Sequence, residues 1–238
     1  MNVFKKMNVK IYADGANKES IIKLNEFDFI KGFTTNPTLM RKAGVKNYRD
    51  FALSILSEIK SKPISFEIFA DDLDEMISQA KEISSWAENV NVKIPITNTK
   101  GLSTESVVER LTKEGVKCNI TAIFTIDQCK NLMDKIDKQT PIVLSIFAGR
   151  IADTGLDPCP IMERIVDMYK NFDNVEILWA SPRELLNIFH ANDSGCHIIT
   201  VADDILKKID LIDKDLNQFS LETVKMFYDD AIESNYSI

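Results

Sequence analysis

Short apolar runs alternate with segments of helical spacing along the whole chain. The runs are rich in aliphatic and β-branched residues and are bounded by polar or turn-forming residues, which is typical of buried strands. Eight such runs cover residues 9–13, 27–33, 64–69, 91–95, 116–120, 141–147, 175–180 and 196–201. After each run the apolar positions recur every three or four residues, which predicts an amphipathic helix.

The predicted helices separate one strand from the next. They begin at about residue 17, span 48–59, begin at 71–72, span 101–115, 126–136 and 158–169, end at about 191, and span 203–209. Alternating strands and helices predict a parallel sheet, and eight such units in 238 residues fit a closed barrel. The competing architecture is an open doubly wound sheet, but no GxGxxG turn follows the first strand.

The expected fold class is therefore α/β, a (β/α)8 TIM barrel. No composition break marks a linker, so we expect a single domain over residues 1–238. One further helix, at about 221–234, has no place in the barrel scheme. It could cover the barrel mouth or dock on a neighbouring subunit.

Composition narrows the classes of partner and compartment. The net charge of −7 argues against nucleic acid, and no apolar run is long enough to span a bilayer. The start of the chain, MNVFKKMNVK, lacks the apolar core of a secretory signal, and the four cysteines have no CxxC spacing. We expect a cytoplasmic protein with reduced thiols. His190 and His197 are too few for a metal site with histidine ligands, so no metal and no cofactor are expected.

One lysine interrupts the fourth apolar run. Pro95 cannot donate to a ladder, so the strand should end there, with the Lys93 amine close to its carboxyl end. Desolvation disfavours an ammonium ion, and a neutral amine attacks carbonyl groups to form a Schiff base. The alternative is a lysine whose stem packs at the strand end while its head reaches water.

The carboxyl ends of the other predicted strands also carry polar residues. In a β/α barrel these ends form the active-site face. Taken one at a time, each of these residues has an ordinary explanation, as a turn former or a small side chain that fills space. Together they would surround one lysine. In chain order they are Asp14, Asn36, Glu67, Lys93, Asn119 with Thr121, Ser145 and Ser181.

Five short motifs carry a resemblance to a known family. They are Thr-Thr-Asn-Pro-Thr-Leu at 34–39, Val-Lys-Ile-Pro at 92–95, Cys-Asn-Ile-Thr at 118–121, Ser-Ile-Phe-Ala-Gly-Arg-Ile at 145–151 and Ala-Ser-Pro-Arg at 180–183. In this order they resemble transaldolase, in the short form related to fructose-6-phosphate aldolase. The resemblance extends from about Ala13 to Val201. That family has a class I aldolase barrel and needs no metal.

The resemblance implies catalytic roles for four residues. Lys93 would form the Schiff base with the donor ketone, and Asp14 would take the proton of the C4 hydroxyl as the C3–C4 bond breaks. Glu67 would act as acid or base through a water molecule that Thr121 holds.

It also implies substrate contacts. Asn36 and Asn119 would bind donor hydroxyls, and Ser145 and Phe147 would line the substrate. A further set would hold the phosphate, because guanidinium groups match its oxygens. This set is Arg150, Ser181 and Arg183. The alternative for the two arginines is surface ion pairing, and Asp153 is expected to pair with Arg150.

The implied activity is transfer of a dihydroxyacetone unit between sugar phosphates in the pentose phosphate pathway. Sedoheptulose 7-phosphate and glyceraldehyde 3-phosphate would give erythrose 4-phosphate and fructose 6-phosphate, and the family further implies a homo-oligomer. The alternatives are a fructose-6-phosphate aldolase-like lyase and a catalytically inactive sugar-phosphate-binding barrel. The lyase branch typically has Gln and Tyr where this chain has Glu67 and Phe147. Gly15, Ile146 and Pro182 depart from the family pattern, which leaves the preferred phosphosugar open.

Overall fold

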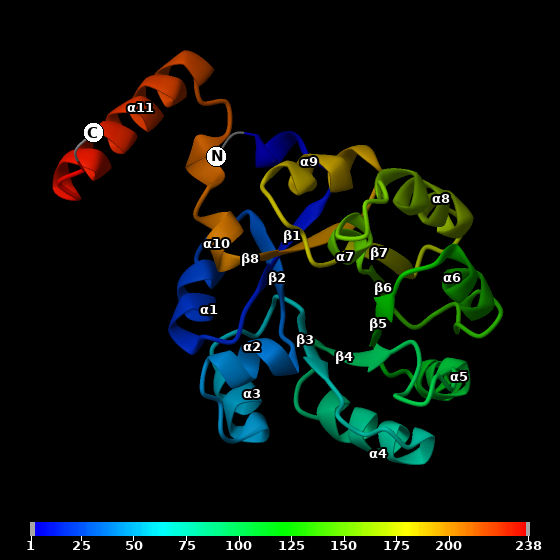
Figure 1. Cartoon of the computed structure of the whole chain (residues 1–238). Helices are drawn as coiled ribbons and strands as arrows, with labels where there is room; N and C mark the ends of the chain where they lie inside the picture. The colour runs from blue at the N-terminus through cyan, green and yellow to red at the C-terminus, as the bar shows by residue number, and fades with distance from the viewer. Residues whose placement is uncertain (1–2, 237–238) are drawn as a thin grey trace.

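The strands of the chain form a closed parallel barrel in a computed structural model, which describes residues 3–236 (Figure 1). The strands are β1 (Lys10–Asp14), β2 (Ile30–Thr34), β3 (Ile64–Glu67), β4 (Val90–Pro95), β5 (Cys118–Ile123), β6 (Ile142–Ile146), β7 (Val175–Trp179) and β8 (Ile198–Ala202). Neighbours in sequence are neighbours in the sheet, and β1 pairs with β8. The predicted (β/α)8 TIM barrel is confirmed, and closure excludes the open sheet.

Helices surround the barrel, except for the last one, which extends away from it (Figure 1). They are α1 (Lys18–Asn25), α2 (Pro37–Lys42), α3 (Tyr48–Leu56), α4 (Leu73–Ser84), α5 (Glu105–Lys113), α6 (Ile126–Leu132), α7 (Ala148–Ala152), α8 (Cys159–Tyr169), α9 (Leu186–Asp193), α10 (Asp203–Leu206) and α11 (Leu216–Glu233), with 3-10 turns at Phe4–Lys6 and Ile209–Leu211. None of the helices in the described part of the chain has both the length and the apolar content needed to cross a membrane.

Two short helices and several boundaries differ from the prediction. Helices α2 and α7 each have six residues or fewer, too short for a periodic pattern to appear. The run predicted at 27–33 yields a strand only from Ile30; before it, Phe29 stacks on Phe4 and Phe27 packs against Phe29. The last helix begins at Leu216, where the Asp215 side chain accepts from the Gln218 amide as its N-cap.

The barrel interior has an apolar floor below the strand ends. Tyr12 packs there with Val143, Leu178 and Ile198 in a cluster separate from the main core. A Cβ atom at Gly32 on the neighbouring strand would lie 2.6 Å from the Tyr12 ring, so glycine is needed beside this ring. Tyr12 lies two residues before Asp14 and thus on the same face of β1. The floor therefore closes the barrel directly beneath the first polar strand end.

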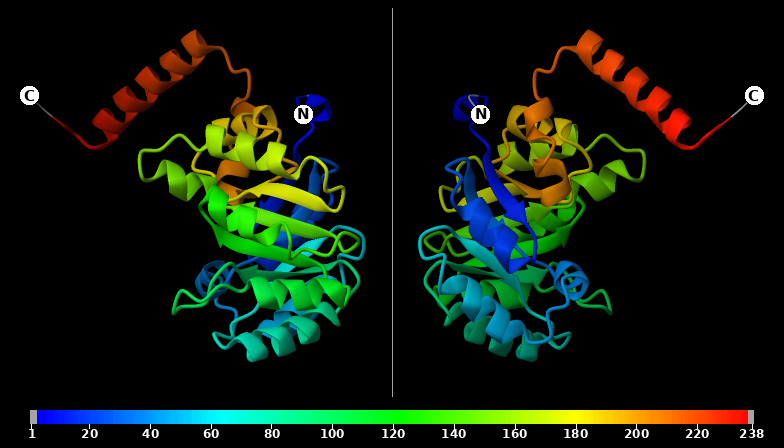
Figure 2. Two further views of the ribbon diagram at one scale, coloured as in Figure 1. Left: turned by 90° about the vertical axis from the view of Figure 1, so that its right-hand side faces the viewer. Right: turned by 90° about the vertical axis from the view of Figure 1, so that its left-hand side faces the viewer.

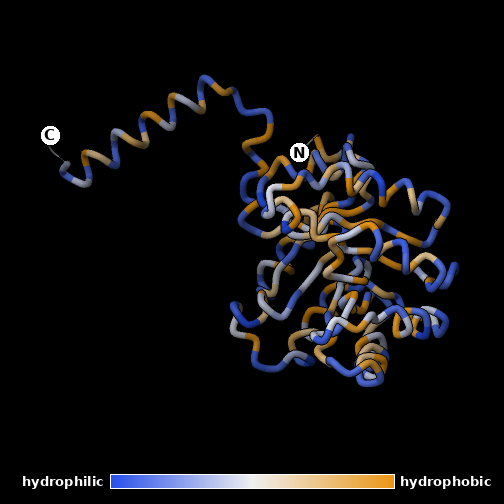
Figure 3. Tube along the Cα trace, turned by 45° about the vertical axis from the view of Figure 1, so that its right-hand side comes forward, coloured by the Kyte–Doolittle hydropathy of each residue, from blue (hydrophilic) through white to orange (hydrophobic). Residues whose placement is uncertain are grey.

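Helix α11 extends away from the barrel (Figures 1 and 2). None of its residues is buried, and apolar positions recur along its exposed length (Figure 3). Its large exposed apolar residues are Leu216, Phe219, Leu221, Val224, Met226, Phe227, Tyr228 and Ile232.

Candidate active site

A cavity of about 430 Å³ opens at the carboxyl ends of the strands. Every site residue predicted from the sequence lines it except Arg183. These lining residues are Asp14, Asn36, Glu67, Lys93, Asn119, Thr121, Ser145, Phe147, Arg150 and Ser181. Thr34 and Thr200, which the sequence analysis did not single out, line it too.

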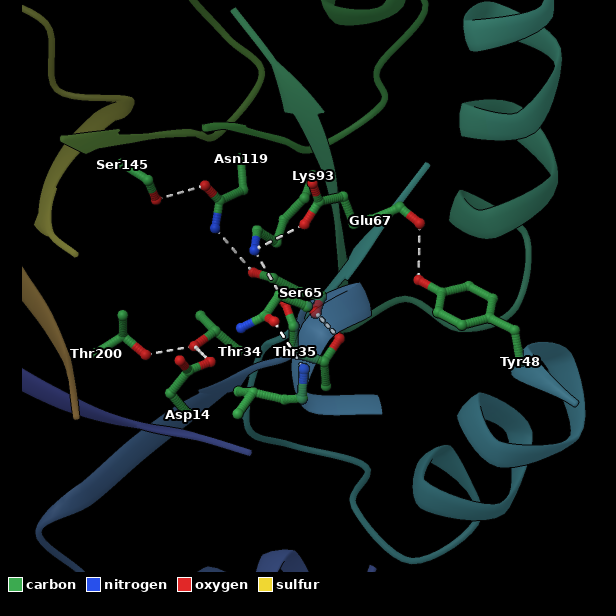
Figure 4. A network of polar contacts seen from close by, with 12 residues as sticks. Asp14, Thr34, Thr35, Tyr48, Ser65, Glu67, Lys93, Asn119, Ser145 and Thr200 are labelled. Carbon is green, nitrogen blue, oxygen red and sulfur yellow. Dashed lines mark hydrogen bonds and ion pairs between the residues drawn. The ribbon is translucent and has the colours of Figure 1, made fainter. Parts of the chain in front are cut away.

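Lys93 lies inside the barrel with only 7% of its surface exposed. Its Nζ donates to the Thr35 carbonyl oxygen at 2.9 Å and lies 3.1 Å from Glu67 Oε2 (Figure 4). The register sets up this pair, because Glu67 on β3 is the direct partner of Lys93 on β4. A buried ammonium needs such a counter-ion, and the same carboxylate is placed to accept its proton when the amine becomes a nucleophile.

The backbone of Glu67 is held by an aromatic side chain from outside the barrel. Tyr48 at the start of α3 donates its hydroxyl to the Glu67 carbonyl oxygen at 2.8 Å (Figure 4). Its ring packs edge-on against Phe66 and Phe69. Burial raises the pKa of Tyr48, so the hydroxyl stays protonated and remains a donor. Nothing in the spacing of the sequence pointed to this contact.

Asp14 at the end of β1 is bound by a hydroxyl group. Thr34 on β2 donates its Oγ1 proton to Asp14 Oδ1 at 2.8 Å, and the Thr34 hydroxyl also contacts that of Thr200 on β8 (Figure 4). Burial raises the pKa of the Asp14 carboxyl, while the nearby Lys93 charge and the Thr34 hydrogen bond act in the opposite direction.

Asn119 is oriented by two serines. Ser145 Oγ donates to Asn119 Oδ1 at 2.6 Å, and Asn119 Nδ2 donates to Ser65 Oγ at 3.0 Å (Figure 4). These two bonds hold the Asn119 amide in place between β3 and β6. Ser65 was not predicted, although alternation along β3 places it on the same face as Glu67.

Thr121 and Asn36, which also line the cavity, each keep a polar group that can bind substrate. Thr121 Oγ1 is buried without a partner among residues 3–236, and buried hydroxyls ordinarily bind water or ligand. Asn36 caps α2 by accepting from the Leu39 amide at 2.9 Å, with Pro37 in the first helical position. The cap commits its carbonyl oxygen and leaves its NH₂ group as the donor for the cavity.

The far wall of the cavity is built from α7 and the segment after β7. The Arg150 guanidinium lies over the Phe147 ring, 5.2 Å from its centroid. A Cβ atom at Gly149 would lie 1.5 Å from the Ser181 carbonyl oxygen, so only glycine allows this approach. Ser181 itself has a φ of 59°, a strained conformation for a residue with a side chain. Ser181 and Arg150 are thereby brought to the same end of the cavity.

The expected pairing of Asp153 with Arg150 is wrong. Asp153 instead binds Arg183, whose Nε donates to Oδ1 at 2.9 Å and whose NH2 group contacts Oδ2. Arg150 turns to the Phe147 ring at the start of α7, and the segment after β7 brings Arg183 to the end of that short helix. The Arg183 guanidinium, bound to both carboxylate oxygens, lowers the pKa of Asp153. Arg183 therefore does not line the cavity.

Comparison with known proteins finds relatives that match most of the chain. A family model described as transaldolase/fructose-6-phosphate aldolase matches residues 11–237. A probable transaldolase of Dehalococcoides mccartyi is 35% identical over 202 residues, which is 84% of this chain and 90% of the relative. A probable transaldolase of Streptococcus equi is 37% identical over 206 residues, with the same coverage.

Solved structures of more distant proteins show the same fold. The chain resembles 3-hexulose-6-phosphate synthase from Salmonella typhimurium with a TM-score of 0.58 at 14% identity, over 85% of this chain and 92% of that one. A mandelate oxidase variant gives a TM-score of 0.56 at 13% identity, over 81% and 65%. At such identities the likeness concerns the barrel alone. From the family match and the close relatives, the chain belongs to the transaldolase/fructose-6-phosphate aldolase family.

Proposed function

We propose that this protein is a transaldolase that transfers a dihydroxyacetone unit between sugar phosphates through a Schiff base on Lys93. The observation that carries the proposal is the buried Lys93 amine, held between Glu67 and the Thr35 carbonyl at the wall of the cavity. Curated relatives named as probable transaldolases support the same activity. The pentose phosphate pathway and a cytoplasmic location belong to this proposal.

The first half of the reaction would build the imine. Lys93 passes a proton to Glu67 and attacks the ketone carbon of the donor; loss of water then gives the protonated imine. Glu67 supplies and removes protons in this step, through a water molecule bound at the Thr121 hydroxyl. Asn119 and Asn36 orient the donor hydroxyls, because both amide residues line the cavity.

Cleavage and transfer would follow on the same lysine. Asp14 takes the proton of the C4 hydroxyl, the electrons of the C3–C4 bond move to the imine, and the aldehyde fragment leaves. The enamine that remains attacks a second aldehyde, and Asp14 returns its proton to the alkoxide that forms. Hydrolysis of the imine then frees Lys93 and releases the new ketose. The Arg150 side chain and the Ser181 hydroxyl would hold the phosphate, because both line the same end of the cavity.

A transaldolase and a simple aldolase differ in whether turnover requires an aldehyde acceptor. We expect turnover of fructose 6-phosphate to require erythrose 4-phosphate, with little free dihydroxyacetone, because Phe147 adds no hydroxyl to activate water at the imine. The Phe147→Tyr variant should raise dihydroxyacetone release without acceptor. A coupled assay of dihydroxyacetone, run with and without the acceptor, measures both.

Phe124 supplies the matched control. Its ring packs against Phe147 at a tilt, with centroids 5.6 Å apart, yet it does not line the cavity. The Phe124→Tyr variant therefore adds a phenol nearby without placing it at the imine, and its release rate should stay at the wild-type value. Free dihydroxyacetone formed by the wild type as fast as transfer would assign the lyase activity instead.

Replacing either arginine should weaken binding of phosphorylated donors more than binding of non-phosphorylated donors. A charge-assisted hydrogen bond contributes about 1.5–3 kcal/mol, so Arg150→Ala should raise KM for fructose 6-phosphate about tenfold or more. Activity on non-phosphorylated dihydroxyacetone donors should change little. Arg183→Ala should act in the same direction if its fork with Asp153 opens to bind phosphate. Steady-state kinetics on both donor types measure the split.

The exposed Arg164 on α8 is a suitable control for lost charge. Arg164→Ala should leave both KM values unchanged. Equal losses on the two donor types in Arg150→Ala would mean that the residue serves the fold or the chemistry rather than phosphate binding.

We also infer that the chain works as a homo-oligomer, as its family implies. Helix α11 supports this inference, because copies of the chain could cover its exposed apolar side chains.

A further inference from the structure

Three neighbouring strands place a row of oxygen atoms at one side of the cavity. Thr200 on β8, Asp14 on β1 and Thr34 on β2 all line it (Figure 4). The two threonines are almost fully buried, with 6% and 3% of their surfaces exposed. Neither is assigned a part in the reaction described above.

The protons in this row can have only one arrangement while Asp14 is ionised. A hydroxyl group has a single proton, and that of Thr34 is donated to Asp14 Oδ1 at 2.8 Å. The contact between the two hydroxyls must then use the proton of Thr200, with Thr34 Oγ1 as the acceptor. Among residues 3–236 no further acceptor binds the Thr200 hydroxyl, so the row has no reversed form that ends on a protein group.

A fixed direction distinguishes the two oxygens of the carboxylate. Oδ1 is hydrogen-bonded by Thr34 in the ionised state, so a proton can settle on Oδ1 only if both hydroxyls turn and Thr200 donates into the cavity instead. Oδ2 has no such donor from Thr34 or Thr200 and is the oxygen free to take a proton from substrate.

We propose that Thr200 and Thr34 form a one-way hydroxyl relay that keeps Oδ1 of Asp14 hydrogen-bonded and reserves Oδ2 for the proton moved in the reaction. This role rests on the proposed function, in which Asp14 is the base. Thr34 and Thr200 are positioning residues, because they act through Asp14 and not on the reacting carbon.

The other charged groups near Asp14 also influence its pKa. Lys93 on β4 favours the carboxylate, Glu67 on β3 opposes it, and Arg150 on α7 is the remaining charge on the cavity wall. Burial raises the pKa of Asp14, and the Thr34 hydrogen bond lowers it because it stabilises the charged form. Removing that hydroxyl should therefore raise the pKa.

Threonine-to-valine variants test the relay, because valine keeps the shape and removes the hydroxyl. Thr34→Val should move the acidic limb of the kcat/KM profile upward by about one pH unit, as expected for a hydrogen bond to a charged group. Thr200→Val should move it in the same direction by less, since Thr34 still donates to Asp14. Thr34→Ser should restore the wild-type limb.

Thr140 provides the matched control. It is also buried, and its hydroxyl donates to the Thr112 carbonyl oxygen at 2.7 Å, away from the cavity. Thr140→Val should leave the acidic limb in place. An unmoved limb in Thr34→Val, or an equal shift in Thr140→Val, would overturn the relay.

A titration without substrate keeps this inference separate from the proposed function. The ¹³C carboxyl resonance of Asp14, identified by its loss in Asp14→Asn, should titrate at a higher pH in Thr34→Val than in the wild type and return in Thr34→Ser. An equal titration in all three proteins contradicts the relay even if the enzyme is a transaldolase. Conversely, a wild type that forms no imine with ketose phosphates contradicts the proposed function and leaves this titration as the measure of the relay.

Discussion

Lys93→Arg should lose on the order of 10⁴-fold or more in turnover, the scale seen when a covalent nucleophile is removed. The guanidinium group keeps the positive charge beside Glu67 but stays protonated at neutral pH and cannot attack a ketone. Incubation with fructose 6-phosphate and borohydride, followed by mass spectrometry, should label the peptide that contains Lys93 in the wild type only.

Two companion variants make the Lys93 result specific. Lys93→Met has a similar length without the amine or the bulk of a guanidinium group, so an equal loss in this variant shows that crowding is not needed to explain the loss in Lys93→Arg. Lys10→Met removes a lysine of β1 that pairs with Glu176 at 2.6 Å and does not line the cavity, and it should keep both labelling and turnover. Labelling of a different lysine in an active wild type would refute the Lys93 assignment.

Asp14→Asn should separate imine formation from bond cleavage. The amide oxygen can still accept from Thr34, but the residue can no longer take a proton, so turnover should fall by about 10²–10⁴-fold. Trapping of the imine by borohydride should persist, because Lys93 and Glu67 are untouched. The measurement compares steady-state transfer with the mass of the trapped adduct. Parallel loss of trapping and turnover would place Asp14 in imine formation or in the fold.

The barrel could be predicted because its pattern is repeated. Each strand is a compact apolar run and each long helix has its own apolar face, so the order of elements alone requires a parallel sheet. Closure followed from the number of units. The two helices that were missed, α2 and α7, are each fixed by a local contact: the Asn36 cap and the approach of Gly149 to Ser181. Neither contact produces a periodic pattern of apolar residues in the sequence.

The candidate site was partly predictable for the same reason. Strand ends meet at one rim, so polar residues at those ends reach one cavity whatever the details of packing. Thr34 and Thr200 received no role because Thr34 directly follows an apolar run and Thr200 lies within one, although alternation along β2 and β8 turns both inward. Tyr48 acts from α3 through a backbone oxygen, and Arg183 depends on where the loop after β7 runs. Such contacts depend on side-chain directions that spacing in the sequence does not specify.

Helix α11 has a consequence for how the chain behaves on dilution. None of its 18 residues is buried, so packing against the barrel contributes little to its stability. In proteins most of the stability of a helix comes from packing of its apolar face, because nucleation is costly and propagation gains little per residue. In a lone chain α11 should therefore sit in a helix–coil equilibrium of its own, uncoupled from the cooperative unfolding of the barrel. Its helicity then becomes a property of protein concentration, rising only where another surface takes up its apolar side chains.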